Sequence, residues 1–310
     1  MKSVSIEPQP QNVPSRRRGI QSSPSERIFH VLNVTFFVLL AVTTVVPFLN
    51  LIAKSLSSEA AVVSGMVGIL PVDIQFGTYR YVLTQSSFLG SLRVSVTVTV
   101  LGTLLALAMT TLAAYPLSKK RLRGRKFFIL MYIFTMLFSG GLIPTYLLMQ
   151  NLHLIDKLPV LFLPGMISVY NMLIIKNFFE GLPDSLEESA KLDGASNLSI
   201  LWKITLPLSL PVLATIALFY AVAFWNDYFA SLIYINSPEN KPLQLYLKEL
   251  FVTSSDTFLK SGNWADNAMN SSPQAIQAAS IILATVPILL VYPFLQKYFV
   301  KGVLIGSVKE

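Results

Sequence analysis

Six long apolar stretches limit how this chain can fold more than any other feature of its sequence. Each holds about 20 mostly apolar residues, enough for a helix to cross the ~30 Å hydrocarbon core of a bilayer. Only 13% of the residues are charged and 53% are hydrophobic, whereas a soluble domain has about 25% charged residues. We therefore predict an all-α membrane protein with six transmembrane helices. They are expected at Ile28–Ala53, Val94–Leu117, Phe127–Met149, Leu158–Ile175, Val212–Ile235 and Ile276–Leu295.

The segments that flank these stretches indicate how the chain is divided. Residues 1–27 are rich in Pro, Ser and Arg and are expected to form a disordered cytoplasmic tail. The apolar run after them is longer than the 7–15 residues of a signal-peptide core, and no small-residue cleavage pattern follows it, so we interpret it as a retained signal-anchor. Residues 28–297 then form the transmembrane domain, and residues 298–310 form a short cytoplasmic tail.

Basic residues are distributed unevenly between the two sides of the membrane. The side with both termini holds 17 of the 24 lysine and arginine residues, in residues 1–27, 118–126, 176–211 and 296–310. Because basic loops stay in the cytoplasm, both termini are expected there, in a multi-pass protein of a bacterial cell membrane. We interpret the basic run 119–126 as a topology determinant that contacts anionic membrane lipid, and not as a nucleic-acid site.

The sequence offers little for catalysis or metal binding. It has no cysteine and two histidines, which excludes thiolate chemistry and nearly excludes a histidine metal site. The apolar stretches hold no paired carboxylates and no serine–histidine pair, which argues against an intramembrane enzyme. No Gly-x-x-x-x-Gly-Lys-Ser/Thr sequence is present, so the chain is expected to bind no nucleotide. We therefore expect no catalytic residue, no metal and no cofactor in this chain.

The cytoplasmic segment 181–211 carries the most informative pattern. Ser185 followed three residues later by Glu188 predicts a capping box at the start of a short helix. That helix should end at Asp193-Gly194, because glycine accepts the left-handed conformation that a helix end requires. A second short helix should begin near Ser196 or the residue after it.

The second helix of this segment is predicted to have an apolar face. Leu198, Leu201, Trp202 and Thr205 follow the i, i+3, i+4, i+7 spacing of one helical side. A soluble partner protein can accept such a face into a groove. The alternative from the residues alone is an elbow at the membrane surface that only connects two transmembrane helices.

Segment 181–211 also resembles a known motif. The sequence Glu-Ser-Ala-Lys-Leu-Asp-Gly-Ala at 188–195 is followed, nine residues after its glycine, by Ile-Thr-Leu-Pro at 204–207. This pattern resembles the EAA loop that marks the membrane subunits of ABC importers. Ser189 stands where alanine is usual, which is a change between two small residues.

Three further segments extend the resemblance. Phe-Trp-Asn-Asp-Tyr at 224–228 is similar to the Trp-Asn-acid pattern of sugar-type permeases, and segments 76–81 and 296–309 are similar to their external and C-terminal segments. The resemblance covers the chain from about Ile28 to its end. It is strongest to the MalG-type carbohydrate permeases, in their LplC/YtcP-like branch.

The resemblance implies the fold, the activity and the partners. The fold would be that of a type I ABC importer permease (MetI-like), and the substrate an oligosaccharide. The partners would be a second homologous permease, two ATPase subunits that hold ATP and Mg²⁺, and an extracellular solute-binding protein. Loop 181–211 would couple the chain to an ATPase. The coupling residues that the motif implies are Glu188, Ala190, Asp193, Gly194, Ala195, Leu201, Ile204 and Pro207.

Asp227 suggests where a substrate path would lie. An acid inside an apolar transmembrane segment costs about 2.5–3.5 kcal/mol on insertion scales, so such residues usually face a wet cavity or the bundle interior. Hydroxyl-binding and aromatic neighbours would suit a sugar. The candidate path residues are Tyr170, Asn171, Trp225, Asn226, Asp227 and Tyr228. The alternative is that these side chains only make polar contacts between helices.

Two other transporter classes are weaker matches to the sequence. A secondary transporter usually has buried ion-coupling acids and inverted repeats, whereas here only Asp227 lies inside a predicted transmembrane stretch and no repeat is visible. An ABC permease for another class of solute is the nearer alternative. The sugar-type patterns at 224–228 and 296–309 argue against it.

Overall fold

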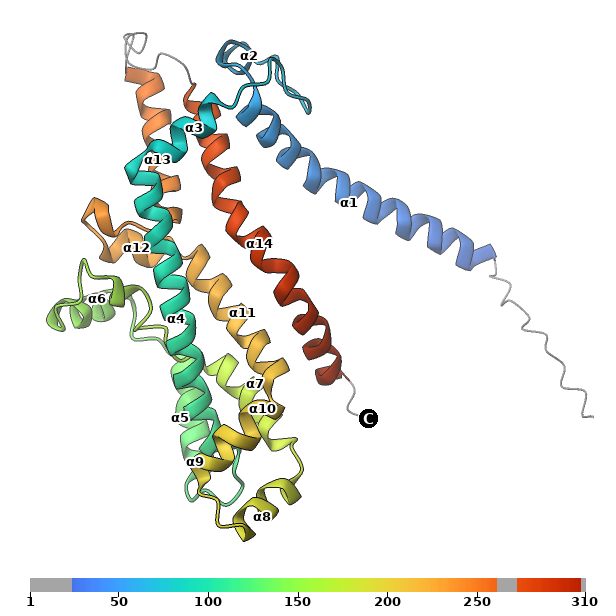
Figure 1. Ribbon diagram of the computed structural model, residues 1–310, viewed down its shortest axis with the longest axis vertical. Helices are drawn as coiled ribbons and strands as arrows, with labels where there is room; N and C mark the ends of the chain where they lie inside the picture. Colours follow the sequence, from blue (N-terminus) through green and yellow to red (C-terminus); the bar gives the residue numbers. More distant parts are fainter. Residues whose placement is uncertain (1–23, 261–271, 308–310) are drawn as a thin grey trace, which may run out of the picture. The chain divides into compact units, whose positions relative to one another are not determined.

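The computed structural model describes residues 24–260 and 272–307, and every regular element in these ranges is helical. Most α-helices are joined by short turns (Figure 1). In chain order the elements are α1 (Pro24–Leu56), α2 (Glu59–Val63), α3 (Gly77–Thr84), α4 (Ser86–Ser118), α5 (Arg125–Leu137), α6 (Leu142–Asn151), η1 (Leu158–Leu161), α7 (Val169–Glu180), α8 (Asp184–Leu192), α9 (Asn197–Ile200), η2 (Leu201–Thr205), α10 (Leu206–Leu208), α11 (Leu210–Asn226), α12 (Phe229–Tyr234), η3 (Pro238–Asn240), α13 (Leu243–Lys260) and α14 (Pro273–Ser307).

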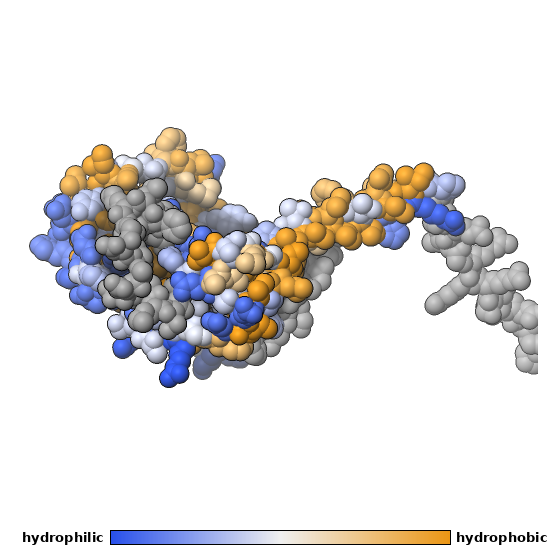
Figure 2. Space-filling view, turned by 90° about the horizontal axis from the view of Figure 1, so that it is seen from above, coloured by the Kyte–Doolittle hydropathy of each residue, from blue (hydrophilic) through white to orange (hydrophobic). Residues whose placement is uncertain are grey.

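The chain divides into two units, residues 1–49 and 50–310. In the first unit, α1 begins at Pro24, so the expected tail is helical over its last four residues and its earlier part lies outside the described residues. Large apolar side chains are exposed along this part of α1, including Phe29, Leu39 and Phe48. Figure 2 shows apolar surface over most of its visible face. A helix that is apolar all round is suited to a bilayer.

Three helices are long and apolar enough to cross a membrane: α1, α4 and the part of α14 from Pro273 to Pro293. Two bent helix pairs bring the possible number to five: α5 with α6, at 108°, and the helical segment Asn197–Leu208 with α11, at 82°. The first, second and sixth predicted helices are therefore confirmed as long helices. Helix α14 continues to Ser307, so most of the expected C-terminal tail is also helical.

The other three predicted transmembrane helices are interrupted. The predicted helix Leu158–Ile175 is wrong as a single element: η1 ends at Leu161 and α7 starts only at Val169. Pro164-Gly165 lies between them, and a proline and a glycine together disfavour a continuous helix. The third predicted helix breaks before Gly141, whose φ of 90° is open to glycine but unfavourable for other residues. The fifth breaks at Asp227.

Helix α4 is the centre of the second unit and packs against α7 and α11. In Figure 1 it runs along this unit from α3 and α13 at one end to α8 and α9 at the other. The main core cluster joins Ala106 and Tyr115 of α4 to Met172 and Ile175 of α7 and Ile216 of α11. One continuous helix, α4, therefore connects the two ends of the second unit.

Gly102 allows α4 to approach its neighbours closely. A Cβ atom on Gly102 would lie 3.0 Å from ring carbons of Phe224 and 3.1 Å from Cβ of Phe162. We expect Gly102→Val to lower the free energy of unfolding by about 1–3 kcal/mol, since the added methyl groups must displace both phenylalanines. Thermal unfolding of the purified protein measures this. Gly90→Val is the matched control on the same helix, because nothing lies within 4 Å of its added Cβ. Equal losses for both variants would contradict the close packing.

Asp156 joins the loop after α6 to the loop after α12. Its Oδ1 accepts hydrogen bonds from the backbone N–H groups of Asn236 (3.0 Å) and Ser237 (2.9 Å), and its Oδ2 accepts one from the Ser237 hydroxyl. The hydrogen bond from the Ser237 hydroxyl has the largest effect on the pKa of the Asp156 carboxyl, and together these bonds lower it. Its own N–H bonds to the Tyr234 carbonyl at 2.8 Å. These hydrogen bonds thus hold the loop after α6 against the loop after α12.

Candidate functional site

The structure gives segment 184–208 the predicted form of two short helical stretches joined by a glycine turn, and we call it the 184–208 element. Its first helix, α8, begins at Asp184 after Pro183, which has an extended ψ of 127°. Ser185 is therefore already inside the helix, and α8 has no side-chain hydrogen bond at its N-cap. The predicted capping box is wrong. Pro183 occupies the N-cap position, two residues too early for Ser185 to act as the cap.

The turn after α8 forms as predicted, at Asp193-Gly194. Gly194 has a φ of 77°. Its N–H bonds to the Lys191 carbonyl at 3.0 Å, and the Ala195 N–H bonds to the Ala190 carbonyl at 2.9 Å. These two bonds make a Schellman motif, in which a left-handed residue closes the end of a helix. Ser196 then caps the next helix by accepting a hydrogen bond from the Ser199 N–H at 3.2 Å.

The apolar face predicted for the second helical stretch is divided between two environments. Leu201 and Thr205 are buried, whereas Leu198 and Trp202 are 63% and 64% exposed. The π-helical turn η2, which spans Leu201–Thr205, interrupts the regular spacing on which the prediction depended. One side of this stretch therefore packs on the core, and the other presents large apolar groups outward.

The 184–208 element exposes several large apolar side chains. Leu192, at the end of α8, is 89% exposed. Leu198 of α9 and Trp202 of η2 are exposed as well. Exposed tryptophan and leucine on a polar segment are typical of a protein-binding surface.

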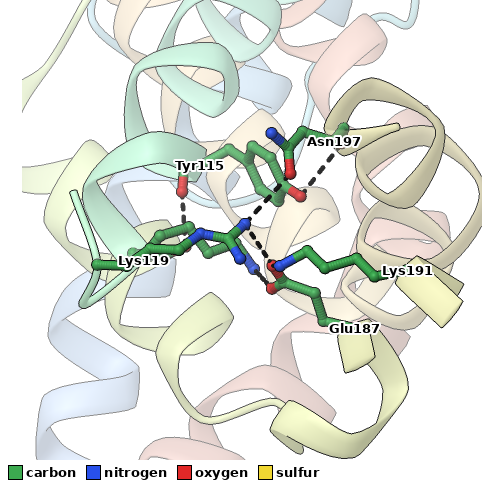
Figure 3. Close-up of polar contacts among 7 residues, drawn as sticks. Tyr115, Lys119, Glu187, Lys191 and Asn197 are labelled. Atoms are coloured by element: carbon green, nitrogen blue, oxygen red, sulfur yellow. Dashed lines mark hydrogen bonds and ion pairs between the residues drawn. The ribbon is translucent and has the colours of Figure 1, made fainter. Parts of the chain in front are cut away.

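Two adjacent glutamates of α8 lie in different environments. Glu187 is half-buried and forms ion pairs with Lys119, Arg121 and Lys191. Figure 3 labels the two lysines among these partners. Glu188 is exposed, and it has no ion pair within the described part of the chain. Sequence reasoning selected Glu188 and missed Glu187. No local signal identifies Glu187, because two of its partners lie more than 60 residues earlier.

All eight predicted coupling residues lie on the same element. Leu201 is buried and contributes to the core cluster that contains Tyr115 and Phe179. Four of these residues are exposed, namely Glu188, Asp193, Gly194 and Pro207, and three are half-buried, namely Ala190, Ala195 and Ile204. The element therefore has an inner side packed on the protein and an exposed outer side.

A second candidate site is an open cavity of ≈590 Å³ beside α11 and α12. Three of the predicted path residues line it: Asn171, Asn226 and Asp227. The volume is within the ~300–1,000 Å³ range of small-molecule sites. Its other polar lining groups include Ser168 and the Tyr220 hydroxyl, and its aromatic lining residues are Phe219, Tyr220, Phe224, Phe229 and Tyr234.

Asp227 was predicted to lie inside a transmembrane helix, but the structure places it at a break between two helices. It follows the last residue of α11, in the break before α12, and its Oδ1 accepts a hydrogen bond from the Ala230 N–H at 3.1 Å. The carboxylate thus satisfies a free donor in the first turn of α12. This contact explains an acid at this position in addition to any role toward a substrate.

The other three predicted path residues lie elsewhere. Trp225 is buried in a cluster with Val82, Phe88 and Leu243, so its ring faces packed side chains. Tyr170 and Tyr228 are 62% and 41% exposed and do not line the cavity. The structure therefore brings together half of the predicted path residues.

Tyr220 was missed by sequence reasoning because it lies in an uninterrupted apolar helix. Its ring is buried and its hydroxyl lies 2.6 Å from the Thr110 hydroxyl of α4. The same hydroxyl accepts a hydrogen bond from the Ser168 N–H at 2.9 Å. Tyr220 thereby joins α4, α11 and the start of α7 at the wall of the cavity.

Comparison with known proteins identifies the family. The family model of the binding-protein-dependent transport system inner membrane component matches residues 102–305, and the chain belongs to this family. It is the transmembrane permease subunit of a binding-protein-dependent ABC importer, a transport protein and not an enzyme. The predicted family membership is confirmed.

Individual relatives and structures agree with this. The chain is 46% identical to protein LplC of Bacillus subtilis, over 94% of this chain and 98% of LplC. It is 44% identical to the polygalacturonan/rhamnogalacturonan transport system permease protein YtcP of the same organism, over 91% and 99%. A chain in the crystal structure of a bacterial ABC transporter involved in the import of the acidic polysaccharide alginate matches with a TM-score of 0.84 and 37% identity, over 90% of this chain and 99% of that one.

Proposed function

We propose that this chain is the permease through which an ATP-driven importer moves an oligosaccharide into a bacterial cell, and that its 184–208 element docks on an ATPase subunit. The observation that carries the proposal is the two-sided 184–208 element. Its inner side is fixed by Leu201 and Glu187, and its outer side exposes Leu192, Leu198 and Trp202. A short helical element with an apolar outer side is suited to a groove on a soluble partner.

The proposed complex contains this chain, a second homologous permease, two ATPase subunits and an extracellular solute-binding protein. ATP and Mg²⁺ would be held by the ATPase subunits, since this chain has no phosphate-binding loop in its sequence. Movement of the ATPases on ATP binding would be transferred through the 184–208 element to the helices packed on it. The residues proposed to couple the two subunits are those of the EAA-like motif, from Glu188 to Pro207.

We propose a topology of six membrane crossings with both termini in the cytoplasm. Helices α1, α4 and α14 would each cross once. The bent pair α5–α6, the segment from η1 to α7 and the segment from α11 to α12 would make the other three crossings. The excess of basic residues in 1–27, 118–126 and 176–211 supports this orientation.

The proposed substrate class rests on relatives and on the cavity. YtcP and the alginate transporter are both named for polysaccharides. The cavity beside α11 offers amide, carboxylate and hydroxyl groups from Asn171, Asn226, Asp227 and Tyr220, together with aromatic rings, and this combination suits a sugar. We propose that these residues form this chain's part of the path, facing the second permease.

Reconstitution into liposomes tests the proposal. With all partner subunits present, uptake of labelled oligogalacturonide is expected to require both ATP and the binding protein. The purified chain alone is expected to hydrolyse no ATP. Uptake driven by an ion gradient without ATP would instead support a secondary transporter. ATP-dependent uptake of an amino acid or phosphate, with no oligosaccharide taken up, would contradict the substrate class.

A further inference from the structure

Three cations from two parts of the chain converge on the Glu187 carboxylate. Arg121 Nη2 lies 2.7 Å from its Oε1, Lys191 contacts the same oxygen, and Lys119 contacts Oε2 (Figure 3). Lys191 is one turn away on α8, but Lys119 and Arg121 belong to the connection that directly follows α4. The side chain of Glu187 is only 15% exposed. The carboxylate thus ties α8 to the end of α4.

The second half of the 184–208 element is tied to the same place. Arg121 Nη2 also donates to the Asn197 side-chain oxygen at 3.2 Å, and the Tyr115 hydroxyl donates to the Asn197 carbonyl at 3.2 Å. Lys119 Nζ lies 4.7 Å from the centre of the Tyr115 ring, a cation–π distance. We call Tyr115, Lys119, Arg121, Glu187, Lys191 and Asn197 the Glu187 cluster. Through it, both α8 and α9 are held by residues at the cytoplasmic end of α4.

A related ion pair holds the neighbouring helix. Glu180, the last residue of α7, pairs with Arg125 at the start of α5 and with Lys176 at 2.9 Å. Three of the six basic residues in 119–126 are therefore engaged with the protein itself: Lys119, Arg121 and Arg125. These ion pairs differ from the lipid contact expected for the run 119–126. Lipid contact stays a prediction for Lys120, Arg123 and Lys126.

The position of α4 in the chain makes these contacts informative. The 184–208 element is covalently continuous with α7 before it and α11 after it, but not with α4. Movement of the element could reach α4 only through packing or through the Glu187 cluster. Helix α4 packs on both α7 and α11 and reaches the opposite end of the second unit.

We propose that Glu187 is a positioning residue that makes α4 move together with the 184–208 element, while Glu188 beside it is left to contact the ATPase. This proposal rests on the proposed coupling function of the element. An isolated ion pair at a surface has little effect on stability, because solvent screens it. The Glu187 cluster differs because one shielded carboxylate separates three cations, which would repel one another without it.

The same substitution at the two neighbouring glutamates separates their roles. In the full reconstituted complex, Glu187→Gln is expected to leave ATPase co-purification within about twofold of wild type. We expect it to reduce substrate transported per ATP by at least about fivefold, the lower range of coupling between sites. Glu188→Gln is expected to weaken ATPase co-purification instead. Glu187→Asp, which retains the charge, should recover part of the transport ratio. An unchanged transport ratio in Glu187→Gln would overturn the proposal.

A distance measurement tests the cluster without any ATPase. The chain has no cysteine, so spin labels can be attached at Arg123→Cys, after α4, and Ser189→Cys, on α8, where both native side chains are exposed. The distance distribution in the full-length chain is expected to be narrow, and to broaden in Glu187→Gln but not in Glu188→Gln. If Glu187→Gln folds poorly, Arg121→Gln is the second variant. It removes one cation of the Glu187 cluster whose side chain is 55% exposed, and it should broaden the distribution in the same way.

The two measurements distinguish failure of this proposal from failure of the coupling function. An unchanged distance distribution in both Glu187→Gln and Arg121→Gln would overturn the proposal even if the 184–208 element binds an ATPase. A broadened distribution in Glu187→Gln, together with no ATPase binding by the wild-type chain, would instead contradict the coupling function. In that case no ATPase movement would be passed to α4.

Discussion

Gly194→Val should abolish substrate uptake and reduce ATPase co-purification about tenfold or more. Gly194 has a φ of 77°, and the left-handed conformation costs about 1–2 kcal/mol for a residue with a side chain, more for a β-branched one. The two hydrogen bonds that close α8 would be lost or strained, and the direction of the following stretch would change. Uptake assays and co-purification from the assembled complex measure the two effects.

Gly194→Asn is the matched control for the backbone. Asparagine accepts the left-handed conformation better than valine, and an added Cβ at Gly194 meets nothing within 4 Å in this chain. If the glycine serves the turn, the asparagine variant should retain much of the co-purification. Normal uptake by Gly194→Val would contradict a coupling role for the turn, since the strained variant would then transport as well as the native one.

Trp202→Asp is expected to weaken binding of the ATPase by about 30-fold or more, which corresponds to the ~2 kcal/mol of a hot-spot residue. Trp202 is 64% exposed, so the substitution should leave the permease folded while placing a charge at the proposed contact. Titration of the purified permease complex with its ATPase measures the affinity.

A second exposed apolar residue provides the comparison. Leu70→Asp changes a side chain that is 77% exposed, in the connection between α2 and α3, far along the sequence from the 184–208 element. Its effect on ATPase affinity is expected to be negligible. If Trp202→Asp and Leu70→Asp bind the ATPase equally well, the outer side of the 184–208 element is not the docking surface.

Local features of the 184–208 element were predictable from the sequence. Gly194 after Asp193 specified the end of α8, and Ser196 specified the next helix start, because these signals act over a few residues. Ser185 was misread because Pro183 starts the helix earlier. The apolar spacing identified Leu198, Leu201, Trp202 and Thr205 as one set. Packing against Tyr115 and Phe179, together with the π-helical turn, then determined which side became buried.

Contacts between distant segments could not be predicted. Glu187 and Lys119 are 68 residues apart, and Tyr220 and Thr110 are 110 apart. The sequence marked Pro164 as an interruption of the fourth apolar segment, but hydropathy did not find the breaks at Gly141 or Asp227, because a run of apolar residues has the same average whether its helix is continuous or bent. Asp227 appeared as an acid inside a membrane helix for the same reason.

Protection of a single cysteine tests the central claim most directly. Trp202→Cys in this cysteine-free chain should react quickly with a water-soluble maleimide in the isolated permease. Because this variant also loses the indole ring, the ATPase is added at a concentration high enough to saturate it; Trp202→Cys should then become protected, whereas Leu70→Cys should react equally in both states. The proposed docking predicts at least about tenfold slower labelling of Trp202→Cys in the complex, as expected for a contact buried in an interface. Equal labelling rates with and without bound ATPase would contradict it.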